Sequence, residues 1–219
     1  GRFPNILTRN GLQEKIFAAV VKILMERKLI LKKGTIVDST FIESPSSTKN
    51  REKKRDPEAH SAKKGNTWHF GYKAHIGVDE ESGLVHTVKA APANEHDVTV
   101  MSELLHGEEE RAYGDSGYIG ANKRPEAIKK NKNEKKIKYL INRRPSPIKK
   151  LKSGQYAAKK KEHQKSSVRC KVEHVFAVIK NIFRYRKTLY RGLRKQTAKL
   201  NIMFALANLY LAARKSLTV

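Results

Sequence analysis

The sequence is poor in cysteine, with Cys170 as the single one among 219 residues. One cysteine permits neither an internal disulfide nor a zinc site made of several cysteines, which favours a reducing, cytosolic compartment. The eight histidines do not pair with cysteine at zinc spacing, and no Ser-His-Asp or Cys-His arrangement stands out. We therefore expect no disulfide framework and no structural zinc.

Long hydrophobic runs are also missing. The most apolar stretch, Leu200 to Ala213, is interrupted by Asn201 and Asn208 and is shorter than the roughly 18 to 20 residues that span a bilayer. It predicts a buried helix, and neither a membrane span nor a signal peptide is expected. The chain opens at Gly1 without an initiator methionine, inside a helical pattern, so we expect an N-terminal part to be missing.

Acidic residues are scarce, because 21 Asp and Glu face 47 Lys and Arg, a net charge of 47 − 21 = +26. This balance argues against most ordinary metabolic enzymes, while 38% hydrophobic residues still suffice for the core of one domain. Duplex DNA carries about one negative charge per 1.7 Å, so it is the first partner to expect for such a surface. The segment 121–169 holds 18 basic residues against 3 Glu, an excess of 18 − 3 = +15.

Hydrophobic periodicity and turn residues divide the chain into elements. The pattern predicts helices over 13–29, 97–105, 168–186 and 195–213, and strands over 34–42, 68–79, 84–91, 136–141 and a short stretch ending at Asp115. Two polar segments, 43–66 and 145–165, are expected to form a surface loop and a basic loop or arm. This order is that of the ribonuclease H-like fold, an α/β class whose mixed sheet extends an antiparallel meander by parallel strands and is flanked by helices.

Two parts of unequal size follow from this pattern. We expect residues 1–33 to form an N-terminal helical segment and residues 34–219 to form the ribonuclease H-like domain. A basic insertion is expected at about 143–167.

The few carboxylates are the candidates for chemistry on a polyanion. Cutting a phosphodiester needs an activated water and relief of charge, which two divalent ions about 3.5 to 4 Å apart can supply through carboxylate ligands. Asp38 lies among β-branched residues of a predicted central strand, where an unpaired carboxylate is costly. Asp115 ends a short strand that we expect beside the first. Each has a plainer alternative, a strand-edge aspartate bonded to a turn for Asp38 and an Asp-Ser-Gly turn for Asp115.

Glu173 is the third candidate. At about 100° per residue, Arg169, Glu173, Lys180 and Arg184 fall within roughly 60° of one another on a helix. That layout suits a carboxylate that reaches a metal while basic neighbours hold phosphates, although a surface ion pair with Arg169 is the simpler explanation. Other acids compete, namely Glu43, Asp79, which lies in a turn, and Asp97, which suits a helix N-cap.

Three motifs together resemble those of the bacterial insertion-sequence DDE transposases, in the branch marked by a Tyr-Arg-Glu-Lys signature. GTIVDST is similar to the first-aspartate motif, GDSGYIG to the second, and Arg169-x3-Glu173-x6-Lys180 to the glutamate motif. The stretches KRDPEAHSAKKGNTWHFGYKAHIGVD and GLVH are similar as well, so the resemblance runs from about Leu29 to the C-terminus. The signature tyrosine is absent, because Ser166 stands three residues before Arg169.

The resemblance implies a catalytic, metal-binding triad of Asp38, Asp115 and Glu173 that holds two Mg²⁺ ions, with Mn²⁺ as a substitute. It implies that the protein cuts double-stranded DNA at terminal inverted repeats and joins 3′ hydroxyls to a target, as a homodimer or larger assembly in the bacterial cytoplasm at the nucleoid. Two alternatives stay open: a DNA-binding transposase remnant without catalysis, and another metal-dependent nuclease of this fold, such as a resolvase.

Basic residues are expected to track phosphates, which gives affinity without sequence information. Besides Arg169 and Lys180, the predicted DNA-binding residues are Arg184, Lys63, Lys64, Arg143, Arg144, Lys149 and Lys150. Trp68 follows Lys63 and Lys64 closely in the sequence. It is expected in the core, since a single tryptophan at the start of a strand is usually buried.

Overall fold

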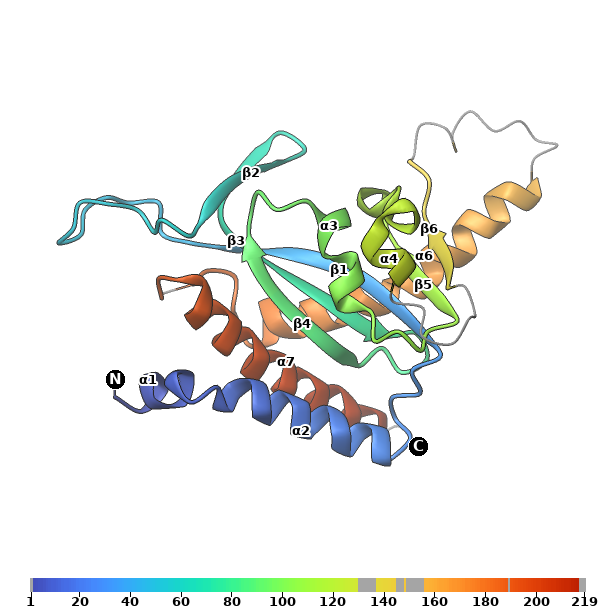
Figure 1. Cartoon of the computed structure of the whole chain (residues 1–219), viewed down its shortest axis with the longest axis horizontal. Helices are drawn as coiled ribbons and strands as arrows, with labels where there is room; N and C mark the ends of the chain where they lie inside the picture. The colour runs from blue at the N-terminus through green and yellow to red at the C-terminus, as the bar shows by residue number, and fades with distance from the viewer. Residues whose placement is uncertain (1, 130–136, 145–147, 149–155, 189, 217–219) are drawn as a thin grey trace.

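The computed structural model describes residues 2–129, 137–144, 148, 156–188 and 190–216, and a mixed sheet forms its centre (Figure 1). The described part of the sheet has six strands: β1 (Gly34–Glu43), β2 (His60–Lys64), β3 (Thr67–Asp79), β4 (Val85–Pro92), β5 (Arg111–Gly114) and β6 (Lys138–Ile141). The strands β1, β3 and β4 are antiparallel to their neighbours in this meander, whereas β5 and β6 continue the sheet in parallel from β1. This is the predicted ribonuclease H-like arrangement.

Helices cover both faces of the sheet (Figure 1). They are α1 (Arg2–Arg9), α2 (Leu12–Glu26), α3 (Asp97–Leu104), α4 (Pro125–Lys129), α6 (Tyr156–Ala177) and α7 (Leu193–Ser216). α6 and α7 pack on one face, with α2 as an outer layer against α7, and α3 packs on the opposite face. Short 3-10 turns follow β5 at Ser116–Tyr118 and Ala121–Lys123.

Strand β1 is the centre of the core because its alternating side chains enter two clusters. Ile36 and Ile42 pack with Val172 of α6 and Phe204 of α7, whereas Val37 packs on the opposite face against α3. All of these side chains are buried. A strand covered on both faces reads as a continuous β-branched run, which is why it was recognisable in the sequence.

Two polar segments differ from expectation. β2 forms within the predicted loop 43–66, where it pairs with the start of β3 from Lys64 opposite Thr67 to His60 opposite Gly71. Helix α6 begins at Tyr156, inside the segment expected to be a basic loop or arm. Its polar side chains obscured the helix, yet Glu162 is buried there and accepts hydrogen bonds from the Arg143 amide at 2.9 Å and from Lys165 at 2.7 Å.

The predicted helix 168–186 does not continue as an α-helix to its end. A π-helical turn spans Val178–Ile182, and the Phe183 amide donates to the Val178 carbonyl five residues earlier. Arg184 follows with a left-handed backbone, φ 54°. The π-turn and this reversal interrupt the 100° periodicity on which the predicted common face of Arg169, Glu173, Lys180 and Arg184 was based.

A buried aspartate in the long loop fixes the start of α7. Asp56 accepts a hydrogen bond from the Tyr72 hydroxyl at 2.6 Å and from the Gly192 amide at 3.0 Å. Glu58 accepts from the Leu193 amide at 2.9 Å, so both acids satisfy amides at this helix N-terminus. The stretch KRDPE, which is part of the resemblance described above, therefore has a structural role in this chain.

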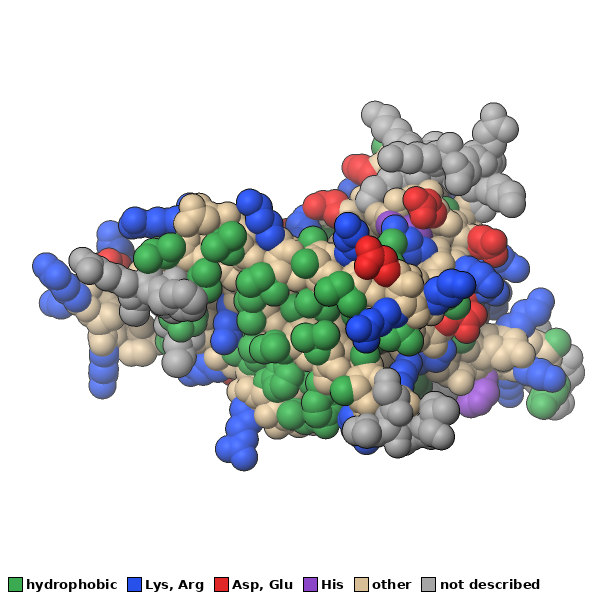
Figure 2. All heavy atoms as spheres, turned by 90° about the horizontal axis from the view of Figure 1, so that it is seen from below, with side chains coloured by type: hydrophobic (Ala, Val, Ile, Leu, Met, Phe, Trp, Pro, Cys, Tyr) green, Lys and Arg blue, Asp and Glu red, His purple; other side chains and the backbone are tan. Residues whose placement is uncertain are grey.

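The outer face of α2 and α7 is apolar. Figure 2 shows hydrophobic side chains gathered there, with basic side chains around them, and the exposed large ones on these helices are Ile16, Ile23, Leu206 and Leu209. Among the described residues, no helix is both long and apolar enough to cross a membrane.

Replacing Asp56 by alanine will destabilise the fold by about 2 to 3 kcal/mol, because the buried Tyr72 hydroxyl loses its acceptor and α7 loses a capping group. Urea unfolding followed by circular dichroism measures the change. Glu52→Ala is the matched control, since it removes an exposed ion pair with Arg191 from the same loop and should leave the midpoint almost unchanged. Equal shifts of the unfolding midpoint in the two variants would contradict the role of Asp56 in fixing the start of α7.

Candidate active site

Asp38 lies in the middle of β1, on the strand face that α6 covers. Its Oδ1 accepts a hydrogen bond from the Ser39 amide at 2.7 Å, and its Oδ2 lies 3.4 Å from the guanidinium of Arg169. Only 19% of the side chain is exposed. Burial raises the pKa of Asp38 to about 6, against the lowering effects of the Ser39 amide and Arg169, and the charge of Asp115 raises it further. One arginine thus compensates this carboxylate incompletely.

Asp115 follows the last residue of β5 and is brought beside Asp38 by the sheet. In the parallel register Ile36 lies opposite Tyr113, so each aspartate stands two residues beyond a paired position. Asp115 caps the next 3-10 turn, where its Oδ1 accepts from the Gly117 amide at 2.8 Å. The Asp-Ser-Gly turn, the plainer alternative for Asp115, therefore exists. It also holds the Asp115 carboxylate at the end of β5.

Arg169 is positioned by α6 and by the end of β6. Its guanidinium contacts the side-chain oxygen of Asn142 at 3.4 Å, and the buried Asn142 amide donates to the Ser166 hydroxyl at 3.2 Å. Ser166, which stands where the signature tyrosine was expected, thus takes part in the hydrogen bonds that connect β6 to α6. The Asp38 partner is fixed from two sides.

Glu173 stands one helical turn after Arg169 on α6, and its side chain is exposed. Val172 and Val175, on either side of it, are buried in the core, as the predicted apolar stripe required. Within the described residues, no group of three His, Cys, Asp or Glu side chains is placed to hold a metal ion. The structure therefore brings Asp38 and Asp115 together and leaves Glu173 outside that pair.

The chemistry of this pair suits a hard divalent cation. Both donors are carboxylates, the ligand type that Mg²⁺ and Mn²⁺ prefer. Burial raises the pKa of Asp38 despite the nearby Arg169, which indicates a carboxylate whose charge is incompletely compensated, and the buried hydroxyl of Tyr118 has no hydrogen-bond partner. An added cation would relieve the repulsion between the two aspartates.

Lys64 and Lys180, two predicted DNA-binding residues that are distant in sequence, lie near each other. Lys180 in the π-turn is partly buried, and burial together with the charges of Lys64 and Arg186 lowers the pKa of its amine. Arg186 also donates to the Lys180 carbonyl at 3.1 Å. This basic cluster joins the end of β2 to the end of α6, and a phosphate would offset its mutual repulsion.

The other predicted DNA-binding residues are scattered. Lys63, Arg143, Arg144 and Arg184 are exposed, while Lys149 and Lys150 lie outside the described residues. Trp68 is not in the core as predicted, because 67% of it is exposed next to the β2–β3 turn, where it pairs with Lys63. The first residues of β3 extend beyond the part of the sheet that other elements cover. The hydrophobic periodicity of the sequence does not reveal this exposure.

The sequence named Asp97 only as a competing acid and helix cap, and it did not single out Lys73. Asp97 was expected to cap α3, but His96 occupies the N-cap position and no side-chain cap bond forms. Instead Asp97 Oδ1 accepts from the Lys73 amine at 3.0 Å and from the Ser39 hydroxyl at 2.9 Å. Lys73 is buried in β3. A lysine within a largely apolar strand was the available sign of a buried ion pair, because a buried lysine needs a partner.

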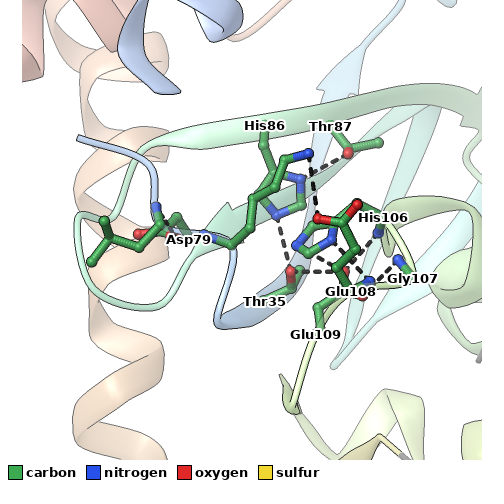
Figure 3. Close-up of polar contacts among 10 residues, drawn as sticks. Thr35, Asp79, His86, Thr87, His106, Gly107, Glu108 and Glu109 are labelled. Atoms are coloured by element: carbon green, nitrogen blue, oxygen red, sulfur yellow. Dashed lines mark hydrogen bonds and ion pairs between the residues drawn. The ribbon is translucent and has the colours of Figure 1, made fainter. Parts of the chain in front are cut away.

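A second polar network lies toward the opposite end of β1 (Figure 3). Thr35 lies 3.0 Å from the Nε2 atom of His86 and donates to Glu109 at 3.0 Å, and Glu109 also accepts from the amides of His106 and Gly107. The His86 and His106 rings meet edge to face with centroids 5.2 Å apart. Since its oxygens already serve these donors, Glu109 acts as a structural anchor.

Acid will weaken the fold through this network. Burial lowers the pKa of His86 to about 3 and also lowers that of His106, so the folded chain binds fewer protons than the unfolded chain below pH 6.5. The free energy of unfolding should therefore fall as the pH drops below 6.5, by up to about 1.4 kcal/mol per pH unit for His86, and His106 should contribute in the same direction. Urea unfolding from pH 7.5 to 5 measures this slope.

The variant His86→Gln should make that pH dependence less steep, with the remaining slope due to His106 and to His75, whose pKa burial lowers to about 4, whereas the exposed His60→Gln should retain the full slope. A parent-like slope in His86→Gln would contradict the assignment.

Comparison with known proteins gives a family match for most of the chain. No solved structure matches the chain at a significant level. The family model described as "Transposase DDE domain" matches residues 30–209, which includes the whole sheet, α3, α6 and most of α7. Members of this family generally use divalent metal ions and act on DNA, in keeping with paired aspartates in a strongly basic chain. The protein belongs to the transposase DDE domain family.

Proposed function

We propose that this transposase cuts DNA at the terminal inverted repeats of an insertion sequence and joins the free 3′ hydroxyls to target DNA. Both steps are phosphoryl transfers that differ only in the attacking oxygen, first of water and then of a 3′ hydroxyl, so one site can perform both. The observation that carries the proposal is the position of Asp38 within β1 next to Asp115, which directly follows the neighbouring parallel strand β5, with Arg169 facing Asp38.

Three carboxylates form the proposed catalytic set. Asp38 and Asp115 provide the preformed pair, and Glu173 is the proposed third ligand because it follows Arg169 by one turn of α6. The site would hold two Mg²⁺ ions, which Mn²⁺ can replace. When bound, such ions supply an activated water and neutralise charge on the attacking and leaving oxygens. The Ser39 and Gly117 amides orient the two aspartates beforehand.

Basic residues around the site are proposed to hold double-stranded DNA. Arg169 would contact a phosphate beside the cleaved bond, while the Lys64–Lys180–Arg186 cluster would contact the backbone further along. The exposed Lys63, Arg143, Arg144 and Arg184 extend this surface, and Lys149 and Lys150 are proposed to add to it. Such contacts position the duplex and carry no base information.

Assembly and location follow from the proposed reaction. Two transposon ends must be cut and joined, which requires at least two active sites and hence a homodimer or a larger complex on DNA. The apolar outer face of α2 and α7 supports packing against another protein surface. We place the reaction at the nucleoid in the bacterial cytoplasm.

Asp38→Asn and Asp115→Asn will each lower metal-dependent cleavage of DNA carrying the cognate ends by at least about a hundredfold, because several kcal/mol of transition-state stabilisation are lost. Glu173→Gln should behave alike if it completes the site. Cleavage and strand transfer are measured with labelled DNA in Mg²⁺ or Mn²⁺. Glu126→Gln, which alters an exposed ion pair with Arg124, serves as the control and should act like the parent.

Each other result has a definite meaning. Full activity in the two aspartate variants would refute the catalytic assignment. Salt-dependent DNA binding with no cleavage by the parent would indicate a DNA-binding remnant. Cleavage of branched DNA without joining would indicate a nuclease of the resolvase type.

Lys64→Ala and Lys180→Ala will weaken DNA binding in the same manner, since both residues belong to one cluster. Each should lower the slope of log affinity against log salt by about one, without changing sequence preference. Fluorescence anisotropy at several salt concentrations measures this. Lys22→Ala on the outer helix α2 is the control, and an equal loss in that variant would show that the cluster has no special role.

A further inference from the structure

Asp97 places a third aspartate near the Asp38–Asp115 pair, yet it has no part in the proposed triad. It is the first residue of α3 and turns its carboxylate toward the sheet instead of capping the helix. Its Oδ1 accepts from the Ser39 hydroxyl at 2.9 Å and from the Lys73 amine at 3.0 Å, and it lies 3.7 Å from the His75 ring. This oxygen therefore joins α3 to β1 and β3 at once.

The contact with Ser39 reaches Asp38 directly. Ser39 is the next residue in β1, and its amide donates to Asp38 Oδ1 at 2.7 Å. The hydroxyl and the amide of Ser39 thus serve Asp97 and Asp38 respectively. Holding the Ser39 side chain fixes the backbone from which Asp38 is oriented.

The second oxygen of Asp97 borders the turn that carries Asp115. Asp97 Oδ2 lies 3.5 Å and Asp115 Oδ1 lies 3.0 Å from the place that a Cβ atom at Gly117 would occupy. Next along this turn, Tyr118 has a buried hydroxyl without a hydrogen-bond partner. Burial and then the charges of Asp97, Asp38 and Asp115 raise the pKa of Tyr118 well above its usual value. Three acids therefore surround one small region.

We propose that Asp97 is a positioning residue, which sets the separation of Asp38 and Asp115 by holding Ser39 on one side and bordering the Gly117 turn on the other. It acts through these neighbours, because Lys73 and Ser39 already occupy its Oδ1. This inference rests on the proposed metal site at Asp38 and Asp115. It adds a residue of α3 to a site otherwise built by β1, β5 and α6.

The test measures Mn²⁺ binding to the full chain without DNA, by isothermal titration calorimetry, together with the melting temperature and the Mg²⁺ concentration that gives half-maximal DNA cleavage. Asp97→Asn should weaken Mn²⁺ binding by at least about tenfold, as expected when a group that orients a ligand is lost. Ser39→Ala should weaken it by about fivefold, the equivalent of one hydrogen bond. Ser39→Thr keeps the hydroxyl and should bind as the parent does.

Two further variants separate the possible failures. Glu103→Gln removes another carboxylate of α3, whose partner Lys89 lies on β4 at 2.5 Å, and should leave Mn²⁺ binding unchanged. Asp38→Asn should abolish the site. If Asp38→Asn binds as the parent does, the proposed metal site itself is wrong.

If Asp38→Asn loses binding while Asp97→Asn and Ser39→Ala bind as the parent does, the positioning role alone is refuted. Should Asp97→Asn fail to fold because Lys73 loses its partner, Ser39→Ala decides, since it leaves that ion pair intact. Loss of melting temperature with unchanged Mn²⁺ affinity in Ser39→Ala would likewise refute the role.

Discussion

Asp38 lies within the strand that is buried on both faces, and the burial of this carboxylate is the constraint on which the surrounding structure depends. The parallel pairing of β1 with β5 places Asp115 beside it, which adds repulsion to the cost of burial. A buried charge of this kind persists only with compensation. Arg169 supplies part of it from α6, and in the proposed function a divalent cation supplies the remainder.

The basic residues of the chain fall into two groups in the folded structure, those paired with acids and those that repel one another. An excess of +26 alone predicts only a polyanionic partner. In the fold, Arg169 neutralises an acid, Lys73 is committed to Asp97, and Lys64 and Lys180 form a cluster whose cations repel one another. Charges that are already paired organise the site, whereas the repelling cluster is better suited to receive phosphate. The positive charge thus has a structural role at the paired residues and, in the proposed function, a binding role at the cluster.

Much of the fold could be predicted because its central strands carry an unmistakable pattern. β1, β3 and β4 combine β-branched residues with turn signals, and the apolar stripe with Val172 and Val175 marked the buried face of α6. The errors lie where tertiary contacts outweigh local sequence. The early start of α6 depends on polar partners for Glu162, and β2 forms by pairing with the extended β3. The π-turn before Arg184 has no signal in a helical wheel.

The site could be predicted in part for the same reason. Asp38 lies in β1 and Asp115 directly follows β5, and both strands were recognisable in the sequence, so the predicted topology placed the two residues near each other. Asp97 was assigned the wrong role, that of a helix cap, because its actual contact with Ser39 joins residues far apart in the sequence. Glu173 remains a prediction, since it stands on the expected helix but outside the aspartate pair.

The most direct test of the account is a crystal structure of the chain soaked in Mn²⁺, with anomalous scattering used to locate the ions. The account predicts an anomalous peak within coordination distance of carboxylate oxygens of both Asp38 and Asp115. A saturating soak with no peak at this pair, or with peaks only at other carboxylates, would contradict it.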